Sequence, residues 1–198
     1  MAIYVAPDDA IGWLITQYFA GKTAGHAVTW INQDGSSDFP GHYLGSHRID
    51  LNEGICQVHV SEQDNSGNML DPEQMWSILI FEFHNLSNHK QWRKIGNLAF
   101  SGKLTRSEYI RMYTYAEYQA IVKTKAFYEV TWIPHLKQKK LPTNPQYWLR
   151  GYKAQYEQWI QQYTKEDYYP YDCFGSEHDE VVIPYLKQRK IPLPRESY

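Results

Sequence analysis

The chain has few cysteines, no long apolar run and no excess of charge, and each absence limits the class of protein it belongs to. Only two cysteines, Cys56 and Cys173, occur among 198 residues, and without an export signal two thiols are expected rather than a disulfide. No run approaches the roughly 18 apolar residues of a membrane-spanning helix. The N-terminal segment places no basic group ahead of an apolar stretch, so no signal peptide is predicted. The sequence therefore predicts a soluble, cytoplasmic protein with no membrane partner.

Charge and motif content exclude further classes. A formal net charge of −2 gives no overall attraction to nucleic acid, so nucleic acid is not expected as a partner. No Gly-rich loop joins a strand to a helix in the pattern that binds phosphate. The eight histidines show no ligand spacing; His84 and His89, for example, are rotated by about 140° on a helix. We therefore predict no metal and no cofactor.

What the chain does have is a high content of aromatic residues. They make up 16% of the residues, with 17 Tyr and 7 Trp. These side chains are apolar in the body and polar at the tip, so they suit a core edge, a groove or a partner surface. With 42% hydrophobic residues, the chain can bury a sizeable core. A single domain over 1–198 is expected.

Local patterns predict an α+β fold. A helix is expected from Asp8 or Asp9 to about residue 19, and 32–45 reads as a loop. Alternating apolar residues predict strands at 27–31, 47–51 and 55–60, the last with Cys56, Val58 and Val60 on one face. Helices are predicted at 71–89, 91–100, 107–130 and 147–163, with Pro134 closing the third region. The predicted class is a mainly helical single domain with a small antiparallel sheet in the N-terminal third.

Two helix starts carry clear capping signals. Asp71 precedes Pro72, which suits the first helical position. The sequence from Thr105 to Glu108 is a capping box, in which the two side chains each satisfy the other residue's backbone N–H. These signals predict where the helices at 71–89 and 107–130 begin.

A single carboxylate, Glu82, interrupts the apolar run of the helix that starts after Asp71. Its neighbours on that helix include Ile78, Leu79 and Leu86. A carboxylate in such surroundings is costly unless it is paired, hydrogen-bonded or protonated. We therefore expect Glu82 to be buried and to have a donor from the 105–130 segment or from a Tyr.

The residues around Glu82 resemble a degenerate zincin. Zincins carry His-Glu-x-x-His on a helix, in which the histidines bind zinc and the Glu activates its bound water. Here the glutamate is Glu82, but Phe81 and Asn85 stand at the two histidine positions. In the gluzincin subclass a Glu from a later helix is the third ligand, and Glu117 in Tyr115-Ala116-Glu117-Tyr118 matches that position. The resemblance covers about residues 45–130, with 131–198 as a helical and basic-turn C-terminal part.

Because both histidine positions are lost, the family's metal and its peptidase activity are not implied for this chain. What the resemblance implies is that Glu82 faces Glu117 across two packed helices. The alternative is a core helix with one buried, hydrogen-bonded Glu. A second candidate cluster, Cys173 and His178 among the acids Glu177, Asp179 and Glu180, is interpreted as an exposed acidic loop, with a Cys–His nucleophile as the alternative.

A ten-residue segment occurs twice. The sequence IPHLKQKKLP at 133–142 recurs as IPYLKQRKIP at 183–192. Each copy is expected to pack its Ile and Leu while showing three cations to solvent. The functional alternative is a basic surface for an acidic partner, made by Lys137, Lys139, Lys140, Lys187, Arg189 and Lys190.

Two functions from different classes follow. The first is a non-enzymatic protein-binding protein, with an immunity or accessory protein of a bacterial toxin system as the specific case and a toxin as its partner. The aromatic composition favours it, since aromatic residues anchor interfaces. The alternative is a hydrolase that uses Glu82 and Glu117 as a carboxylate pair.

Overall fold

The computed structural model describes residues 29–33, 45–50, 55–61, 63–64, 67–149, 151–164 and 167–194. They divide into two compact units, each built from two stretches of chain. The first unit contains Met1–His89 and Ala120–Arg150, and the second contains Lys90–Gln119 and Gly151–Tyr198. The helix predicted to end near residue 19 and most of the predicted 32–45 loop lie outside the described residues.

The chain is mainly helical, as predicted, but the predicted α+β class with a small antiparallel sheet is wrong. Three short strands are described: β1 (Thr29–Gln33), β2 (Gly45–Asp50) and β3 (Ile55–Ser61). They pair in the order β1-β3-β2, and β3 runs parallel to β1 but antiparallel to β2. The small sheet is therefore mixed. The sequence could not show this, because alternation locates a strand but carries no information on the direction in which the strand pairs.

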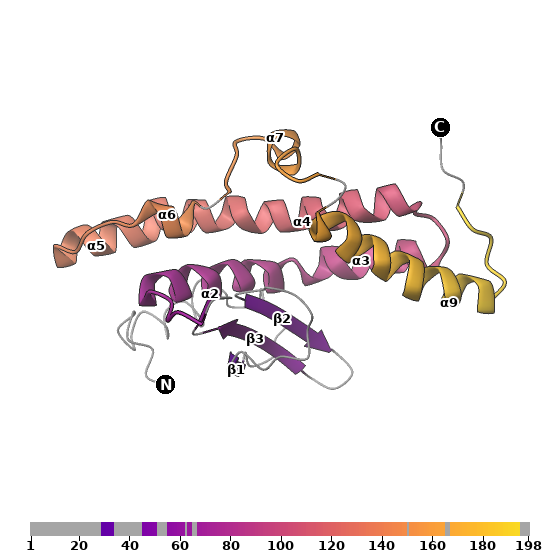
Figure 1. Ribbon diagram of the computed structural model, residues 1–198, viewed down its shortest axis with the longest axis horizontal. Coiled ribbons are helices and arrows are strands. Elements are labelled where there is room, and N and C mark those ends of the chain that lie inside the picture. Colours follow the sequence, from indigo (N-terminus) through magenta and orange to yellow (C-terminus); the bar gives the residue numbers. More distant parts are fainter. Residues whose placement is uncertain are drawn as a thin grey trace. The chain divides into compact units, whose positions relative to one another are not determined.

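Helix α2 (Pro72–Ser87) packs against β2 and β3 in the first unit (Figure 1). It begins where the sequence predicts. Asp71 accepts a hydrogen bond from the Glu73 backbone N–H at 2.8 Å, which caps the first turn. The helix ends at Ser87, earlier than predicted, and Asn88 separates it from the next helix.

The core of the first unit joins the sheet to α2 and to the segment that follows residue 126. Its buried apolar side chains come from β3, from α2 and from residues 127–148, and several are aromatic. Val58 and Val60 of β3 are buried, as the alternation predicts. The largest aromatic members are Trp76, Phe127, Tyr128, Trp132 and Trp148.

Helices α3 (His89–Phe100) and α4 (Arg106–Phe127) confirm two further predictions. Residues 101–105 separate them, and the capping box forms as expected. The Thr105 N–H donates to Glu108 Oε2 at 2.9 Å, and the Glu108 N–H donates to Thr105 Oγ1 at 3.2 Å.

Pro134 does not close the helical region, contrary to the prediction. A π-helical turn, η2 (Tyr128–Trp132), follows α4 and leads directly into α5 (Ile133–Lys139). The Ile133 N–H donates to the Tyr128 carbonyl five residues back. Pro134 lies in the first turn of α5, where its missing N–H costs little. The π turn therefore lets the helix restart at the proline instead of ending there.

The second copy of the repeat has the same local structure in the second unit. The π turn η4 (His178–Val182) leads into α9 (Ile183–Gln188), and the Ile183 N–H donates to the His178 carbonyl. Lys140 and Lys190 both have φ of 56°, and both copies then place the next residue's N–H on a leucine carbonyl at 2.9 Å. The repeat is therefore structural as well as sequential.

The helix predicted over 147–163 is also wrong. Two short helices occur instead, α6 (Pro145–Trp148) and α7 (Tyr156–Ile160). Between them Gly151 has φ of 69°, a left-handed conformation that stops a helix. Trp148 is buried in the first unit and Trp159 in the second. The spacing of these tryptophans mimics one helix face although they lie in different units.

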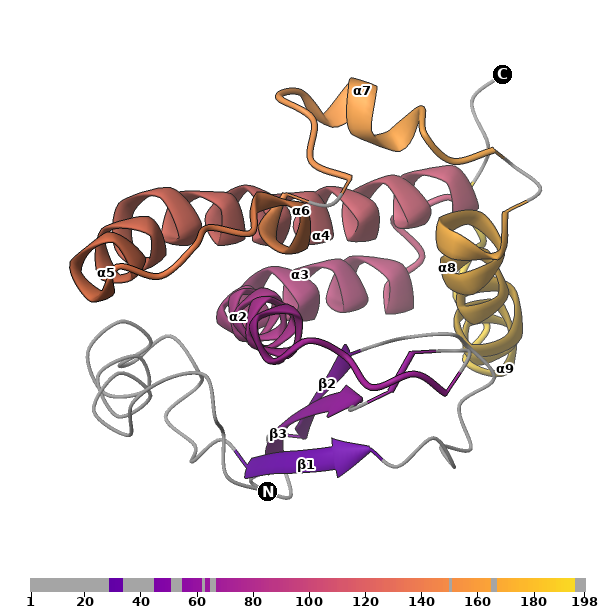
Figure 2. The ribbon, with the colours of Figure 1, turned by 60° about the vertical axis from the view of Figure 1, so that its left-hand side comes forward.

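The second unit packs α8 (Cys173–Glu177) and α9 beside α3 (Figure 2). The turn after α9 sits close to Gly102, where an added Cβ would lie 2.5 Å from the Pro192 carbonyl oxygen. Gly102 also has φ of 71°, so both backbone conformation and space require glycine. The ring of Phe100, at the end of α3, also meets the ring of Tyr185 on α9 edge to face, with 5.0 Å between the ring centroids.

The predicted acidic loop at 172–180 is helical. It consists of the end of η3 (Tyr168–Asp172), all of α8 and the start of η4. Glu177, Asp179 and Glu180 are exposed, as expected. His178 in the same segment is buried, with only 3% of its surface exposed. The acids therefore line one side of a helix whose other side belongs to the core.

Candidate functional site

Glu73, in the first turn of α2, is a buried carboxylate that accepts three side-chain hydrogen bonds. The indole N–H groups of Trp132 and Trp148 donate to its Oε1 at 2.8 and 2.9 Å. The Asn144 side-chain amide donates to its Oε2. All three donors are N–H groups, which the carboxylate satisfies without giving a proton in return. Glu73 thus ties α2 to η2 and α6.

The rings around Glu73 form a closely packed aromatic cluster. Trp132 contacts Trp76 at 5.8 Å and Trp148 at 5.6 Å between ring centroids, and Tyr128 stacks on Trp148 at 5.4 Å. Burial raises the pKa of Tyr128, and the nearby Glu73 carboxylate raises it further. The arrangement is a core that encloses one carboxylate, with its donors supplied from within the unit.

Glu82 is buried, as predicted, with 5% of its surface exposed. The Asn85 side-chain amide, one turn later on α2, donates to Glu82 Oε2 at 3.4 Å. Asn85 stands at one of the two positions where a zincin has a histidine, and it is 1% exposed. A donor on the same helix therefore contacts Glu82, whereas the sequence favoured one from the 105–130 segment or a Tyr.

Glu117 lies in the second unit, on α4, and is half-buried. The Tyr169 hydroxyl donates to Glu117 Oε2. The predicted pair thus has its members in different units, each with a neighbour of its own. That Glu82 and Glu117 face each other stays a prediction.

The structure gives the remaining site candidates separate surroundings. His178 Nδ1 lies 3.2 Å from Asp179 Oδ1, and its ring contacts Tyr109 at 5.3 Å. Burial raises the pKa of Asp179, but hydrogen bonds from His178 and Arg106 and the Arg106 charge hold it below its usual value. Within the residues that the structure describes, no group of three or more His, Cys, Asp or Glu could hold a metal ion.

The two basic turns, defined as Lys137, Lys139 and Lys140 in the first unit and Lys187, Arg189 and Lys190 in the second, are both exposed. In each copy a leucine, Leu136 or Leu186, is buried in the core. Arg189 lies over the Tyr185 ring at 5.7 Å, and no ion pair between these six cations and a described carboxylate occurs. The turns thus combine a fixed backbone with cations that are available to a partner.

A further basic surface lies along α3, in the second unit. A groove of about 410 Å³ is lined by four cations and three uncharged residues. We call it the α3 groove, and its lining consists of Lys90, Arg93, Lys94, Asn97, Leu98, Ser101 and Lys103. The cations are exposed. No carboxylate is among these lining residues, so every charged side chain that lines the groove is positive.

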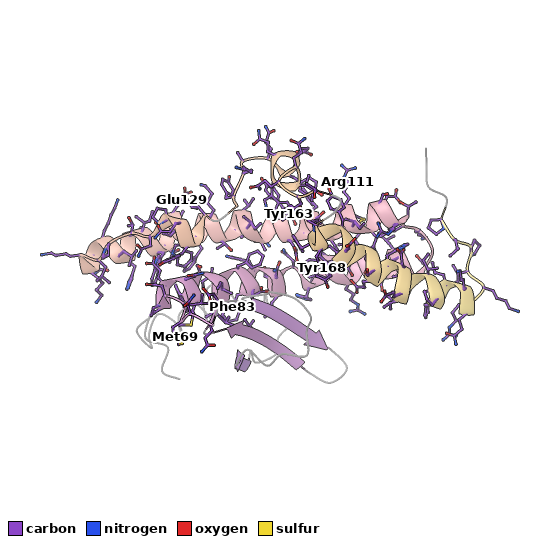
Figure 3. The ribbon with its side chains drawn as sticks, in the orientation of Figure 1. Met69, Phe83, Arg111, Glu129, Tyr163 and Tyr168 are labelled. Carbon is purple, nitrogen blue, oxygen red and sulfur yellow. The ribbon has the colours of Figure 1, made fainter. Side chains whose placement is uncertain are left out.

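A second pocket, of about 390 Å³, lies between α4 and α7 in the same unit. Figure 3 labels Arg111, which borders it, on α4. Tyr115 and Tyr156 meet edge to face at 5.3 Å on its wall. Glu108 and Glu157 also line it, so charges of both signs are present and no single ligand class is favoured.

Sequence reasoning did not identify Glu73 or the α3 groove. A glutamate in the first turn of a helix is usually explained by the helix dipole alone. Nothing in the sequence therefore indicated that Glu73 accepts hydrogen bonds from distant side chains. The signal for the groove was available: no Asp or Glu occurs from His84 to Ser107, while five Lys or Arg do.

Comparisons with known proteins give no relative for this chain. No family model matches it, and neither a curated protein nor a solved structure does. In the part of the chain that the structure describes, no helix is long and apolar enough to cross a membrane.

Proposed function

We propose that the protein is a non-enzymatic binding protein whose partner is an acidic protein. One observation carries this proposal: the basic turn occurs twice with the same backbone, and all six of its cations are exposed. A duplicated turn that only closed a helix would not need three cations in both copies. Charged groups held in a fixed geometry steer an oppositely charged partner.

Within this class we propose an immunity or accessory protein of a bacterial toxin system on a degenerate zincin-like scaffold. The buried Glu82 supports the scaffold, and the loss of both histidine positions is the reason to expect no zinc on it. Two measurements test this narrower proposal. Coexpression with the product of a neighbouring gene should yield a stable complex. Protein purified without chelator should carry no stoichiometric zinc, because Phe81 and Asn85 supply no suitable ligand; about one zinc per chain would overturn the scaffold proposal.

The binding proposal is tested by charge reversal in the turns. We expect Lys139→Glu combined with Arg189→Glu to weaken binding of a fluorescein-labelled polyglutamate peptide, measured by anisotropy, by about tenfold. The affinity of the unaltered protein should fall as salt is added, because ions screen exposed charges.

Arg111→Glu combined with Lys153→Glu is the matched control. It changes the net charge by the same amount at exposed cations outside the turns. Equal loss in both variants would show that only net charge matters and would overturn the proposal. Unfolding midpoints of all variants should agree, since the altered side chains are on the surface.

A further inference from the structure

We infer that the α3 groove binds a carboxylate-rich segment of a protein partner, separately from the two basic turns. This inference rests on the proposed function, since it names a docking surface for an acidic partner. Lys90, Arg93 and Lys94 follow one another at the spacing that places side chains on one helix face. Lys103, in the connection after α3, adds a fourth cation to the same groove.

None of the four groove cations forms an ion pair with a carboxylate of the described residues. Arg106, outside the groove, does form one, because its Nε lies 2.9 Å from Asp179 Oδ2. Within the part of the second unit that the structure describes, a cation outside the groove is therefore paired with an acid and those lining the groove are not. Clustered cations repel one another, so an anionic occupant would relieve that repulsion.

The form of the groove favours a macromolecular segment over a small molecule. Its volume of about 410 Å³ is open to solvent along the helix. A small-molecule site buries most of its ligand, whereas this groove is open and four of its seven lining residues are cations. An extended acidic segment can instead lie along α3, with each carboxylate meeting one or two cations.

Two observations favour a protein over a nucleic acid. The groove lining holds no aromatic side chain on which a base could stack. Elsewhere in the same unit Asp172, Glu177 and Glu180 are exposed, and the chain as a whole has a net charge of −2. A long phosphate backbone needs more positive surface than this one groove supplies, whereas a short acidic segment does not.

The test compares two reversals in the full-length protein. Lys90→Glu with Lys94→Glu alters the groove, and Lys139→Glu with Arg189→Glu alters the basic turns. The probes are the labelled polyglutamate peptide and a labelled oligothymidylate of matched charge. We expect the groove reversal to weaken peptide binding about tenfold, the Arg111→Glu and Lys153→Glu control to leave it nearly unchanged, and the peptide to bind more tightly than the oligothymidylate.

Each outcome is decisive. Full peptide binding in the groove variant, with loss in the turn variant, overturns this inference and leaves the proposed function standing. Loss only in the groove variant supports the inference and removes the turns from the proposal. If the unaltered protein does not bind the peptide, both this inference and the proposed function are overturned. If the groove binds the oligothymidylate more tightly than the peptide, this inference is overturned and the α3 groove is a nucleic-acid site. If the reversal does not fold, Lys90→Gln with Lys94→Gln should still weaken peptide binding about threefold.

Discussion

Two carboxylates on α2, Glu73 and Glu82, are both buried but differ in how the surrounding structure satisfies them. Glu73 accepts hydrogen bonds from two indoles and one amide that come from residues 132–148. Glu82 accepts one at 3.4 Å from Asn85 on its own helix. Since a buried donor left unpaired costs more than a typical bond is worth, removing Glu73 should disturb more of the structure.

We expect Glu73→Ala to lower the free energy of unfolding by about 2–4 kcal/mol, because it leaves two buried indole N–H groups without an acceptor. Glu73→Gln should cost less, since its carbonyl oxygen can still accept from both tryptophans. Urea unfolding followed by tryptophan fluorescence measures both effects. Equal, small losses in the two variants would mean that the indoles find other acceptors.

For Glu82→Ala the expected loss is smaller, about 1–3 kcal/mol, and comes from removing the carboxylate to which the buried Asn85 amide donates. Chemical unfolding gives the value directly. An unchanged midpoint would show that Glu82 faces water and would remove the argument for a buried carboxylate at this position.

At this scale the sequence allowed one of the two carboxylates to be predicted. Glu82 stands out because apolar residues surround it in the sequence itself. The donors of Glu73 lie at least 59 residues away along the chain, so no local pattern reveals them. Long-range partners of this kind are visible only in the folded chain.

At the scale of elements, the repeat shows how a local sequence can specify a backbone. The eighth residue of each copy, Lys140 or Lys190, lies in the left-handed region with φ of 56°. Glycine is the residue that adopts this conformation most readily. A lysine at this position therefore has a conformational cost, which fits a role for its charge.

Replacing Lys190 by glycine should therefore stabilise the protein, by about 0.5–1 kcal/mol, because the left-handed conformation costs glycine little. Lys187→Gly, inside α9 and equally exposed, is the matched control and should destabilise by about 0.5–1 kcal/mol. Thermal unfolding of the two variants should shift in opposite directions. A shift in the same direction would argue against the left-handed lysine as the source of strain.

The two wrong helix boundaries have local causes. Proline is read as a stop because it lacks an N–H and clashes with the preceding turn, but a π turn before Pro134 removes that conflict. The predicted helix over 147–163 relied on apolar spacing, which could not show that Trp148 and Trp159 belong to different units. Capping signals, by contrast, act within a few residues, and both were confirmed.

For the whole molecule, the distribution of charge matters more than its sum. A net charge of −2 argued correctly against a uniformly basic surface, yet it concealed a stretch without any acid from His84 to Ser107. The direction of strand pairing and the division into two units depend on contacts between distant segments, and composition does not encode them. The candidate binding surfaces were therefore only half predictable: the basic turns from their repetition, the α3 groove from the structure.

The most direct test of the central claim is the association rate of the polyglutamate peptide across a salt series, measured by stopped-flow anisotropy. Exposed cations that steer an acidic partner act mainly on the association rate. The account predicts that the rate for the unaltered protein falls steeply with salt, and that Lys139→Glu with Arg189→Glu slows association and flattens this dependence. An association rate that is the same in both proteins at every salt concentration would contradict it, and the basic turns would then be ordinary solvated surface.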